Sequence, residues 1–252
     1  MKICFSYLWI VTVLCATTNA AKLPENLKRC RQTDPNLNEC IRVSVTDAIR
    51  KMADGLPTLG ISPLQPLAIN AINLGQGNGP VNIRQEYTNI KLHGLCDSVL
   101  TTYNAQLDKY MLYTEAITPK MEFIADYVMN GRVIVLPVQG KGLANITMVG
   151  LKTTHTLIGE PFKKKGKQYM RLVDYKLTTE PKRVYFHFDN LFNGDSILAP
   201  TTLNFFNENW KDIYDEIKPQ YEESFEYMLS AVTGGHLMVS NTRYLPEFCH
   251  TL

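Results

Sequence analysis

The chain has 252 residues, with 26 basic and 24 acidic side chains and a formal net charge of +2 at pH 7. This near balance gives no reason to expect nucleic acid or an anionic membrane surface as a partner. Apolar residues make up 45% of the chain and charged residues 20%, a composition typical of a globular protein with a substantial core.

The first twenty residues have the pattern of a secretory signal peptide. Lys2 supplies a positive start, residues 3–16 are largely apolar, and residues 18–20 fit a cleavage site that ends in a small residue. The apolar run is short for a membrane span, and no second run of about 18 uninterrupted apolar residues follows it. We therefore expect cleavage after residue 20 and a single secreted, extracellular domain over 21–252.

Two of the six cysteines lie in the signal peptide, which leaves four in the mature chain. Cys30 and Cys40 are close enough in sequence to pair in an oxidising compartment. A bridge across so short a loop contributes roughly 2–3 kcal/mol in the chain-entropy description. For Cys96 and Cys249 the sequence leaves both a disulfide and two thiols open, because pairing depends on their separation in the fold.

The mature N-terminal region predicts a helix over residues 34–55. Asp34 suits the N-cap, Pro35 suits the first helical position, and Gly55 ends the pattern. Apolar residues recur between them every three or four positions and form one stripe. Three prolines between residues 57 and 66 then predict an extended, irregular connection.

From residue 81 to residue 188 the apolar pattern changes to a period of two, which predicts strands. Asn130-Gly131 predicts a tight hairpin turn, and the apolar run 133–136 predicts a strand covered on both faces. Further strands are predicted at 90–95, 99–113, 146–157, 169–177 and 184–188. Short connections between consecutive strands predict an antiparallel meander. Asn145-Ile146-Thr147 is a sequon, so Asn145 is a candidate glycosylation site.

The last third of the chain returns to helical spacing. An apolar stripe runs from Leu203 to Val232 and stays in phase across Pro219, so we predict one long helix kinked there or two collinear helices. About 30 residues make a rod of roughly 45 Å. The acidic residues at 212–216 and 222–226 are predicted to form its solvated face.

A stripe of that length must be buried against an equally long apolar surface. The antiparallel sheet is the available partner, and it must curl around the helix. The predicted fold is therefore α+β, a long C-terminal helix wrapped by a highly curved antiparallel sheet, with an internal hydrophobic tunnel that a ligand can fill.

No motif for catalysis or for metal binding stands out. The chain lacks a nucleophile elbow, a zinc-protease motif and a phosphate-binding lysine motif. The histidines are scattered without metal-ligand spacing, and they are His93, His155, His187, His236 and His250. We expect no enzyme activity, no cofactor and no metal. His155 lies between threonines in a predicted strand and is a candidate hydrogen-bond partner for a ligand.

The candidate lining of the tunnel combines inward-facing aromatic and aliphatic residues of strands and helix with His155. Met121, Phe123 and Tyr127 share one strand face, and Phe186 and Phe188 share another. The full predicted set is Met121, Phe123, Tyr127, Val133, His155, Phe186, Phe188, Phe206, Trp210, Phe225 and Met228.

Several separate motifs occur in the order seen in the insect takeout and haemolymph juvenile-hormone-binding proteins. These motifs are DPNLNEC at 34–40, Leu-Pro at 136–137 before Gly-Lys-Gly at 140–142, FDNLFNGD at 188–195 and NENW at 207–210. Over nearly the whole mature chain the sequence resembles this family. The resemblance implies the tubular lipid-binding architecture, secretion, a bound juvenile hormone or other long apolar ligand, and a disulfide between Cys30 and Cys40.

Two departures from the family pattern are visible. Cys96 and Cys249 do not match the second bridge of the hormone carriers, which favours the takeout branch. Gln65 stands where many relatives have aspartate before Pro-Leu, which predicts altered local hydrogen bonding.

The leading hypothesis is a secreted carrier that binds a small hydrophobic ligand reversibly, such as juvenile hormone, another terpenoid or a fatty-acyl lipid. The alternative is an extracellular signalling protein that acts through its surface, with a permanent ligand or none.

Overall fold

The computed structural model describes residues 25–31, 33–57, 61–75, 79–164, 167–232 and 244–245. The predicted signal peptide lies outside these ranges, and so do His236, Cys249 and His250. The side chain of Met228 is also outside the description, although its backbone belongs to a helix.

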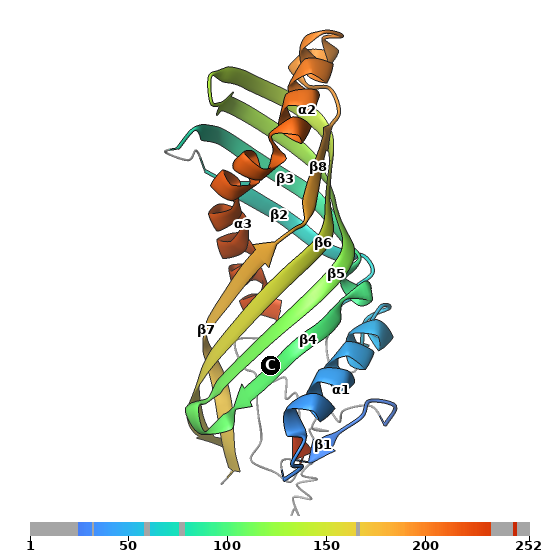
Figure 1. Ribbon diagram of the computed structural model, residues 1–252, viewed down its shortest axis with the longest axis vertical. Helices are drawn as coiled ribbons and strands as arrows, with labels where there is room; N and C mark the ends of the chain where they lie inside the picture. The colour runs from blue at the N-terminus through green and yellow to red at the C-terminus, as the bar shows by residue number, and fades with distance from the viewer. Residues whose placement is uncertain are drawn as a thin grey trace, which may run out of the picture.

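One large antiparallel sheet dominates the described part of the chain (Figure 1). The strands run in the order β2-β3-β5-β6-β7, while β4 pairs with β5 and β8 pairs with β6. Their bounds are β2 Leu67–Leu74, β3 Val81–His93, β4 Val99–Gln106, β5 Met111–Val133, β6 Leu136–Lys164, β7 Lys167–Glu180 and β8 Arg183–Phe188. A separate two-stranded pair joins β1, Cys30–Arg31, to β9, Tyr244–Leu245.

Strands β5 and β6 are long enough for each to pair with different strands at its two ends. β5 pairs with β4 through its first residues, 111–117, and with β3 through residues 122–133. β6 pairs with β8 through residues 144–149 and with β7 through residues 152–164. The two long strands run along the molecule, and the shorter strands fill the two ends on either side, so the twisted sheet forms an elongated curved surface (Figure 1).

The β5–β6 hairpin lies four residues later than the sequence predicts. The prediction of a turn at Asn130-Gly131 is wrong, because both residues continue the ladder. Gly131 is needed there for close strand approach: a Cβ on it would lie 2.2 Å from the carbonyl oxygen of Asn82 on β3. The turn is made by Ile134 and Val135, which are 49% and 83% exposed. The predicted covered strand at 133–136 is therefore wrong.

Long-range contact explains the position of this turn. Ile134 has a φ of 57°, a conformation that β-branched residues rarely adopt. Its N–H donates to the carbonyl oxygen of Pro80 at 2.6 Å, so the residue before β3 holds the hairpin in place. The strand predicted at 99–113 is likewise divided, because a 3-10 turn at Leu107–Lys109 separates β4 from β5. Other 3-10 turns occupy Leu95–Asp97 and Phe192–Gly194.

The N-terminal helix α1, Leu37–Lys51, begins later and ends earlier than its predicted range. Asp34 does not cap the helix directly; its carboxylate accepts from the N–H of Asn36 at 2.8 Å and shapes the turn before it. The predicted disulfide between Cys30 and Cys40 is present and joins β1 to the first turn of α1. Cys96 carries a thiol that donates to the carbonyl oxygen of Ile49 at 3.5 Å.

The C-terminal helical region consists of α2, Leu198–Glu208, and α3, Trp210–Val232. The break lies at Asn209, whose φ and ψ of −104° and 27° leave the helical range. Pro219 lies inside α3, which continues through it, so the predicted alternative of two helices meeting at Pro219 is wrong and the division lies at Asn209 instead. α3 lies against the hollow of the sheet, with β7 on one side and β2 and β3 on the other (Figure 1).

Helical side chains cover the free edges of three strands. On β4, the carbonyl oxygen of Leu100 accepts from Arg42 of α1 at 2.7 Å. On β8, the amide of Asn207 pairs in both directions with the backbone of Phe186, at 2.9 Å each. On β7, carboxylates of α3 accept from backbone N–H groups. Unpaired backbone N–H and C=O groups at the edge of a sheet can pair with other chains. These contacts therefore dock the helices on the sheet and also occupy some of its edge groups.

The structure therefore confirms the predicted fold: a curved antiparallel sheet packs around a C-terminal helical segment. Strand β2 adds to this sheet although no strand is predicted for it from its pattern. Within the described ranges, none of the helices is both long enough and apolar enough to cross a membrane.

Candidate ligand-binding cavity

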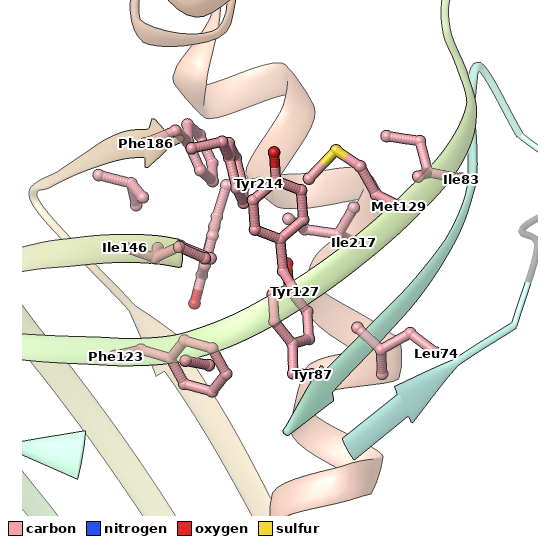
Figure 2. Close-up of a cluster of buried hydrophobic side chains, with 14 of the residues drawn as sticks. Leu74, Ile83, Tyr87, Phe123, Tyr127, Met129, Ile146, Phe186, Tyr214 and Ile217 are labelled. Carbon is pink, nitrogen blue, oxygen red and sulfur yellow. The ribbon is translucent and has the colours of Figure 1, made fainter. Parts of the chain in front are cut away.

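The core lies between the hollow face of the sheet and α3. Tyr87 of β3 and Phe123 of β5 face this interior, as do Ile146 of β6 and Tyr214 and Ile217 of α3 (Figure 2). Tyr87 is 0% exposed, and its ring meets that of Phe123 edge to face at 5.1 Å between centroids. The alternating pattern of the strands and the three-to-four spacing of the helix thus converge on one apolar interior.

This interior is incompletely filled. A cavity of about 120 Å³, the large cavity, lies between the sheet and α3. Twelve of its eighteen lining residues are leucine, isoleucine, methionine or phenylalanine. The lining comprises Leu67, Leu92, Leu95, Met121, Phe123, Ile146, Met148, Leu151, Thr153, His155, Leu177, Thr179, Phe186, Tyr214, Ile217, Tyr221, Glu222 and Phe225. Apolar walls with a few polar groups are typical of a small-molecule site.

One polar group of the lining is built around His155 on β6. Its Nδ1 lies 2.5 Å from the hydroxyl of Tyr175, and its Nε2 lies 3.0 Å from the hydroxyl of Thr153. Burial lowers the pKa of the His155 imidazole to about 4. The ring is therefore neutral near pH 7. A neutral imidazole donates through one nitrogen and accepts through the other. One of the two hydroxyl groups, that of Tyr175 or that of Thr153, therefore accepts from His155 and keeps its own proton free to donate elsewhere.

A second polar group joins β7 to α3. The hydroxyl of Thr179 lies 2.6 Å from that of Tyr214 and donates to the carboxylate of Glu222 at 2.8 Å. The same Glu222 carboxylate lies 3.7 Å from Lys218. Burial raises the pKa of Tyr214 to about 12, so its hydroxyl stays protonated. Glu222 is the one charged side chain in the lining of the large cavity.

A small cavity of about 20 Å³ adjoins the large one. Its lining comprises Val81, Ile83, Gln85, Tyr87, Met129, Val133, Ile146, Phe186, Phe188, Phe206, Ile213, Ile217 and Tyr221. Gln85, Tyr87 and Tyr221 form a buried hydrogen-bonded cluster at this place. We call it the Gln85–Tyr87–Tyr221 cluster.

The predicted lining residues divide between the two cavities. Met121, Phe123, His155 and Phe225 line the large cavity, and Phe186 lines both. The remaining members that border the small cavity are Val133, Phe188 and Phe206. The other thirteen lining residues of the large cavity were not predicted. Nine of them lie on predicted or observed strands, and the other four, Tyr214, Ile217, Tyr221 and Glu222, lie on α3. Ile217 and Tyr221 belong to the apolar stripe of the predicted helix, so the sequence pattern could have indicated them.

Two predicted residues line neither of these cavities. The hydroxyl of Tyr127 donates to the carbonyl oxygen of Asp189 at 2.6 Å, which directs it to the segment after β8. Trp210 is half-buried, and the guanidinium of Arg183 lies 5.5 Å from the centroid of its ring. Tyr127 is thus held by Asp189, just after β8, and Trp210 contacts Arg183 of β8. Met228, whose side chain lies outside the description, has no assigned place.

The predicted glycosylation site lies on β6. Asn145 alternates with the buried Ala144 and Ile146, so its side chain belongs to the outer face of the sheet. Its side-chain amide oxygen accepts from the hydroxyl of Thr147 at 3.2 Å, within the sequon itself. Among the described residues, no three histidine, cysteine or acidic side chains gather as a set that could hold a metal ion.

The residues that carry the resemblance hold the connection between β8 and the helices. Asn190 donates from its side chain to the carbonyl oxygen of Lys141 at 3.0 Å. Asp195 accepts from the N–H groups of Ile197 and Leu198, at 2.9 and 2.8 Å, where α2 begins. The motif at 188–195 therefore sets the direction in which the chain leaves the sheet for α2.

Comparison with known proteins assigns this architecture. Residues 8–235 match the family described as haemolymph juvenile hormone binding protein (JHBP). The chain belongs to the JHBP family. It is 25% identical over 228 residues to the circadian clock-controlled protein daywake of Drosophila melanogaster, covering 87% of this chain and 86% of that protein. For daywake of Drosophila yakuba the identity is 24% over 240 residues, covering 92% and 91%.

A solved structure confirms the fold of this JHBP family member. The crystal structure of Takeout 1 of Epiphyas postvittana superposes with a TM-score of 0.69 at 22% sequence identity. The match covers 82% of this chain and 90% of Takeout 1. At that identity the likeness establishes the shared fold.

Proposed function

We propose that this protein is a secreted carrier that binds one small hydrophobic ligand reversibly inside the sheet–helix tube. The large cavity carries this proposal: it is a partly open space of about 120 Å³ between the sheet and α3, with predominantly apolar walls. Membership of the JHBP family supports the same role. The ligand class consists of long apolar molecules such as a terpenoid hormone or a fatty-acyl lipid.

Apolar burial alone is sufficient to hold such a ligand. A molecule that buries about 15 CH₂ groups gains roughly 12 kcal/mol. Association costs at least about 4 kcal/mol, which leaves near 8 kcal/mol and a dissociation constant in the micromolar range. The polar groups of the cavity then discriminate among ligand head groups. Binding at this strength is reversible, as a carrier requires.

The charges of the large cavity favour a neutral head group. Glu222 is acidic, the imidazole of His155 is neutral near pH 7, and Lys218 is placed beside Glu222 and not among the lining residues. A ligand carboxylate would be desolvated there without a cationic partner, which is costly. An ester, ketone or alcohol instead finds hydroxyl partners such as Thr153.

Mass spectrometry of the secreted, purified protein tests this proposal. The intact complex is weighed under native conditions, and an organic extract of the same sample is analysed in parallel. A neutral apolar molecule at one per chain supports the carrier, and adding an excess of a different apolar molecule should displace it. A chain that carries no ligand and takes up none of a panel of esters, alcohols and terpenoids contradicts it and favours the surface-signalling alternative.

Secretion and glycosylation belong to the same proposal. We expect the secreted protein to begin near Ala21 and to carry a glycan on Asn145, on the outer face of β6. N-terminal sequencing gives the first result, and the mass change on treatment with a glycosidase gives the second. Neither result depends on whether the large cavity binds a ligand.

A further inference from the structure

The large and the small cavity are separated by a thin wall of side chains. Four residues line both spaces, and these are Ile146, Phe186, Ile217 and Tyr221. Ile146 and Phe186 come from the sheet, and Ile217 and Tyr221 come from α3, one turn apart. The small cavity, at about 20 Å³, has room for about one water molecule, so it is of use to a ligand only when it is joined to the large one.

Tyr221 differs from the other three members of this wall because its tip is tethered. Its hydroxyl lies 2.9 Å from the hydroxyl of Tyr87 and 3.0 Å from Oε1 of Gln85. The hydroxyl of Tyr87 in turn donates to Oε1 of Gln85 at 2.7 Å. Tyr87 and Gln85 are 0% and 6% exposed, so the tether lies deep in the core.

The surroundings make this tether hard to release. The ring of Tyr221 meets those of Tyr87 and Phe123 at 6.3 and 6.5 Å between centroids. Swinging the ring out of the wall removes a hydrogen-bond partner from buried polar groups, with no solvent at hand to replace it. Ile146, Phe186 and Ile217 are apolar and can change rotamer without that loss. Tyr221 is therefore the fixed member of the wall.

We propose that Tyr221, held by Tyr87 and Gln85, closes the large cavity toward the small one and so sets the length of apolar ligand that the protein accepts. This inference rests on the proposed carrier function and adds the selection of chain length. Ligands that fit the large cavity bind without disturbing the cluster. Longer ligands must displace the Tyr221 ring before they reach the small cavity.

A series of saturated primary alcohols from octanol to eicosanol tests this inference, because these probes are neutral and differ only in length. Affinity is measured by calorimetry for the wild type, Tyr221→Phe and Tyr221→Ala. In the wild type, affinity should rise about fourfold for each added methylene and then stop rising at a limiting length. Tyr221→Ala should move that limit to longer alcohols by several carbons.

Tyr221→Phe keeps the ring volume and removes the tether, so it tests the cluster even where the alanine variant folds poorly. The longest alcohols should gain affinity relative to the shortest ones, because displacing the ring no longer breaks hydrogen bonds. Tyr127→Phe is the matched control: it also removes a buried tyrosine hydrogen bond, but Tyr127 lines neither cavity. It should leave the length profile unchanged.

The outcomes separate this inference from the proposed function. Binding of the alcohols with the same limiting length in the wild type and both Tyr221 variants overturns the role of Tyr221 and leaves the carrier intact. A folded wild-type protein that binds none of the alcohols overturns the carrier function and this inference together. A longer limit in the Tyr221 variants alone supports both.

Discussion

Glu222 of α3 accepts two hydrogen bonds from one residue of β7, the N–H of Thr179 at 2.5 Å and its hydroxyl at 2.8 Å. One turn further along the helix, Glu226 accepts from the N–H of Leu177 at 2.7 Å. Thr179 and Leu177 are two positions apart on β7 and face the same way, and Glu222 and Glu226 are four positions apart on α3 and face the same way. Each carboxylate therefore meets one backbone N–H of the strand. The prediction that these acidic residues form a solvated face is wrong for Glu222, whose side chain is 15% exposed.

Replacing Glu222 with alanine should destabilise the fold by about 2 kcal/mol, because the N–H of Thr179 loses a charged acceptor. Glu222→Gln keeps an acceptor oxygen and should cost about half as much. Denaturant unfolding gives the free energies, and hydrogen exchange should quicken at the Thr179 amide. Glu223→Ala, on the exposed face of the same helix, is the control. Equal losses for Glu222→Ala and Glu223→Ala would contradict the edge contact.

Asn207 docks α2 on β8 because its side-chain amide pairs with the backbone of Phe186 as a neighbouring strand would. Asn207→Ala removes the acceptor for the N–H of Phe186 and the donor to its carbonyl oxygen, so a loss of about 2–3 kcal/mol is expected. Asn207→Asp retains the acceptor and should lose less. The exposed Asn204→Ala on the same helix should be neutral in the same unfolding experiment. A neutral Asn207→Ala would show that α2 is held by its apolar face alone.

Tyr127→Phe should lower the free energy of unfolding by about 1 kcal/mol, because the carbonyl oxygen of Asp189 loses its donor. Ligand affinity should stay unchanged, since Tyr127 lines neither cavity. Thermal unfolding and a binding titration on one preparation check both parts. A large loss of affinity with unchanged stability would return Tyr127 to the ligand site predicted from the sequence.

His155 makes folding stability depend on pH. Its pKa is about 4 in the folded protein against 6.5 ordinarily, so between these values the unfolded chain binds more protons. Stability should therefore be fully present above about pH 6.5 and fall as the pH drops toward 4, by about 3 kcal/mol in total. The wild type minus His155→Gln difference isolates this residue. A difference that does not vary with pH would sink the idea of a neutral, buried imidazole.

The amino-acid pattern by itself determined the architecture of this protein. Alternation from residue 81 to 188 and helical spacing from Leu203 to Val232 record which residues are buried, and burial of a long stripe requires a long curved partner. The same pattern identified Phe123 and Phe186 as inward-facing, and sequence proximity allowed the Cys30–Cys40 bridge that the family resemblance implied. These features depend on neighbours a few positions apart, which a sequence displays directly.

Tertiary contacts decided the rest. The hairpin at Ile134 depends on the carbonyl oxygen of Pro80, some fifty residues earlier, and overrides the stronger local turn signal of Asn130-Gly131. The tether of Tyr221 to Gln85 joins groups 136 positions apart. Unfilled space between packed elements leaves no mark on the periodicity of any one element. The cavities and the wall that divides them therefore exist only in the folded arrangement.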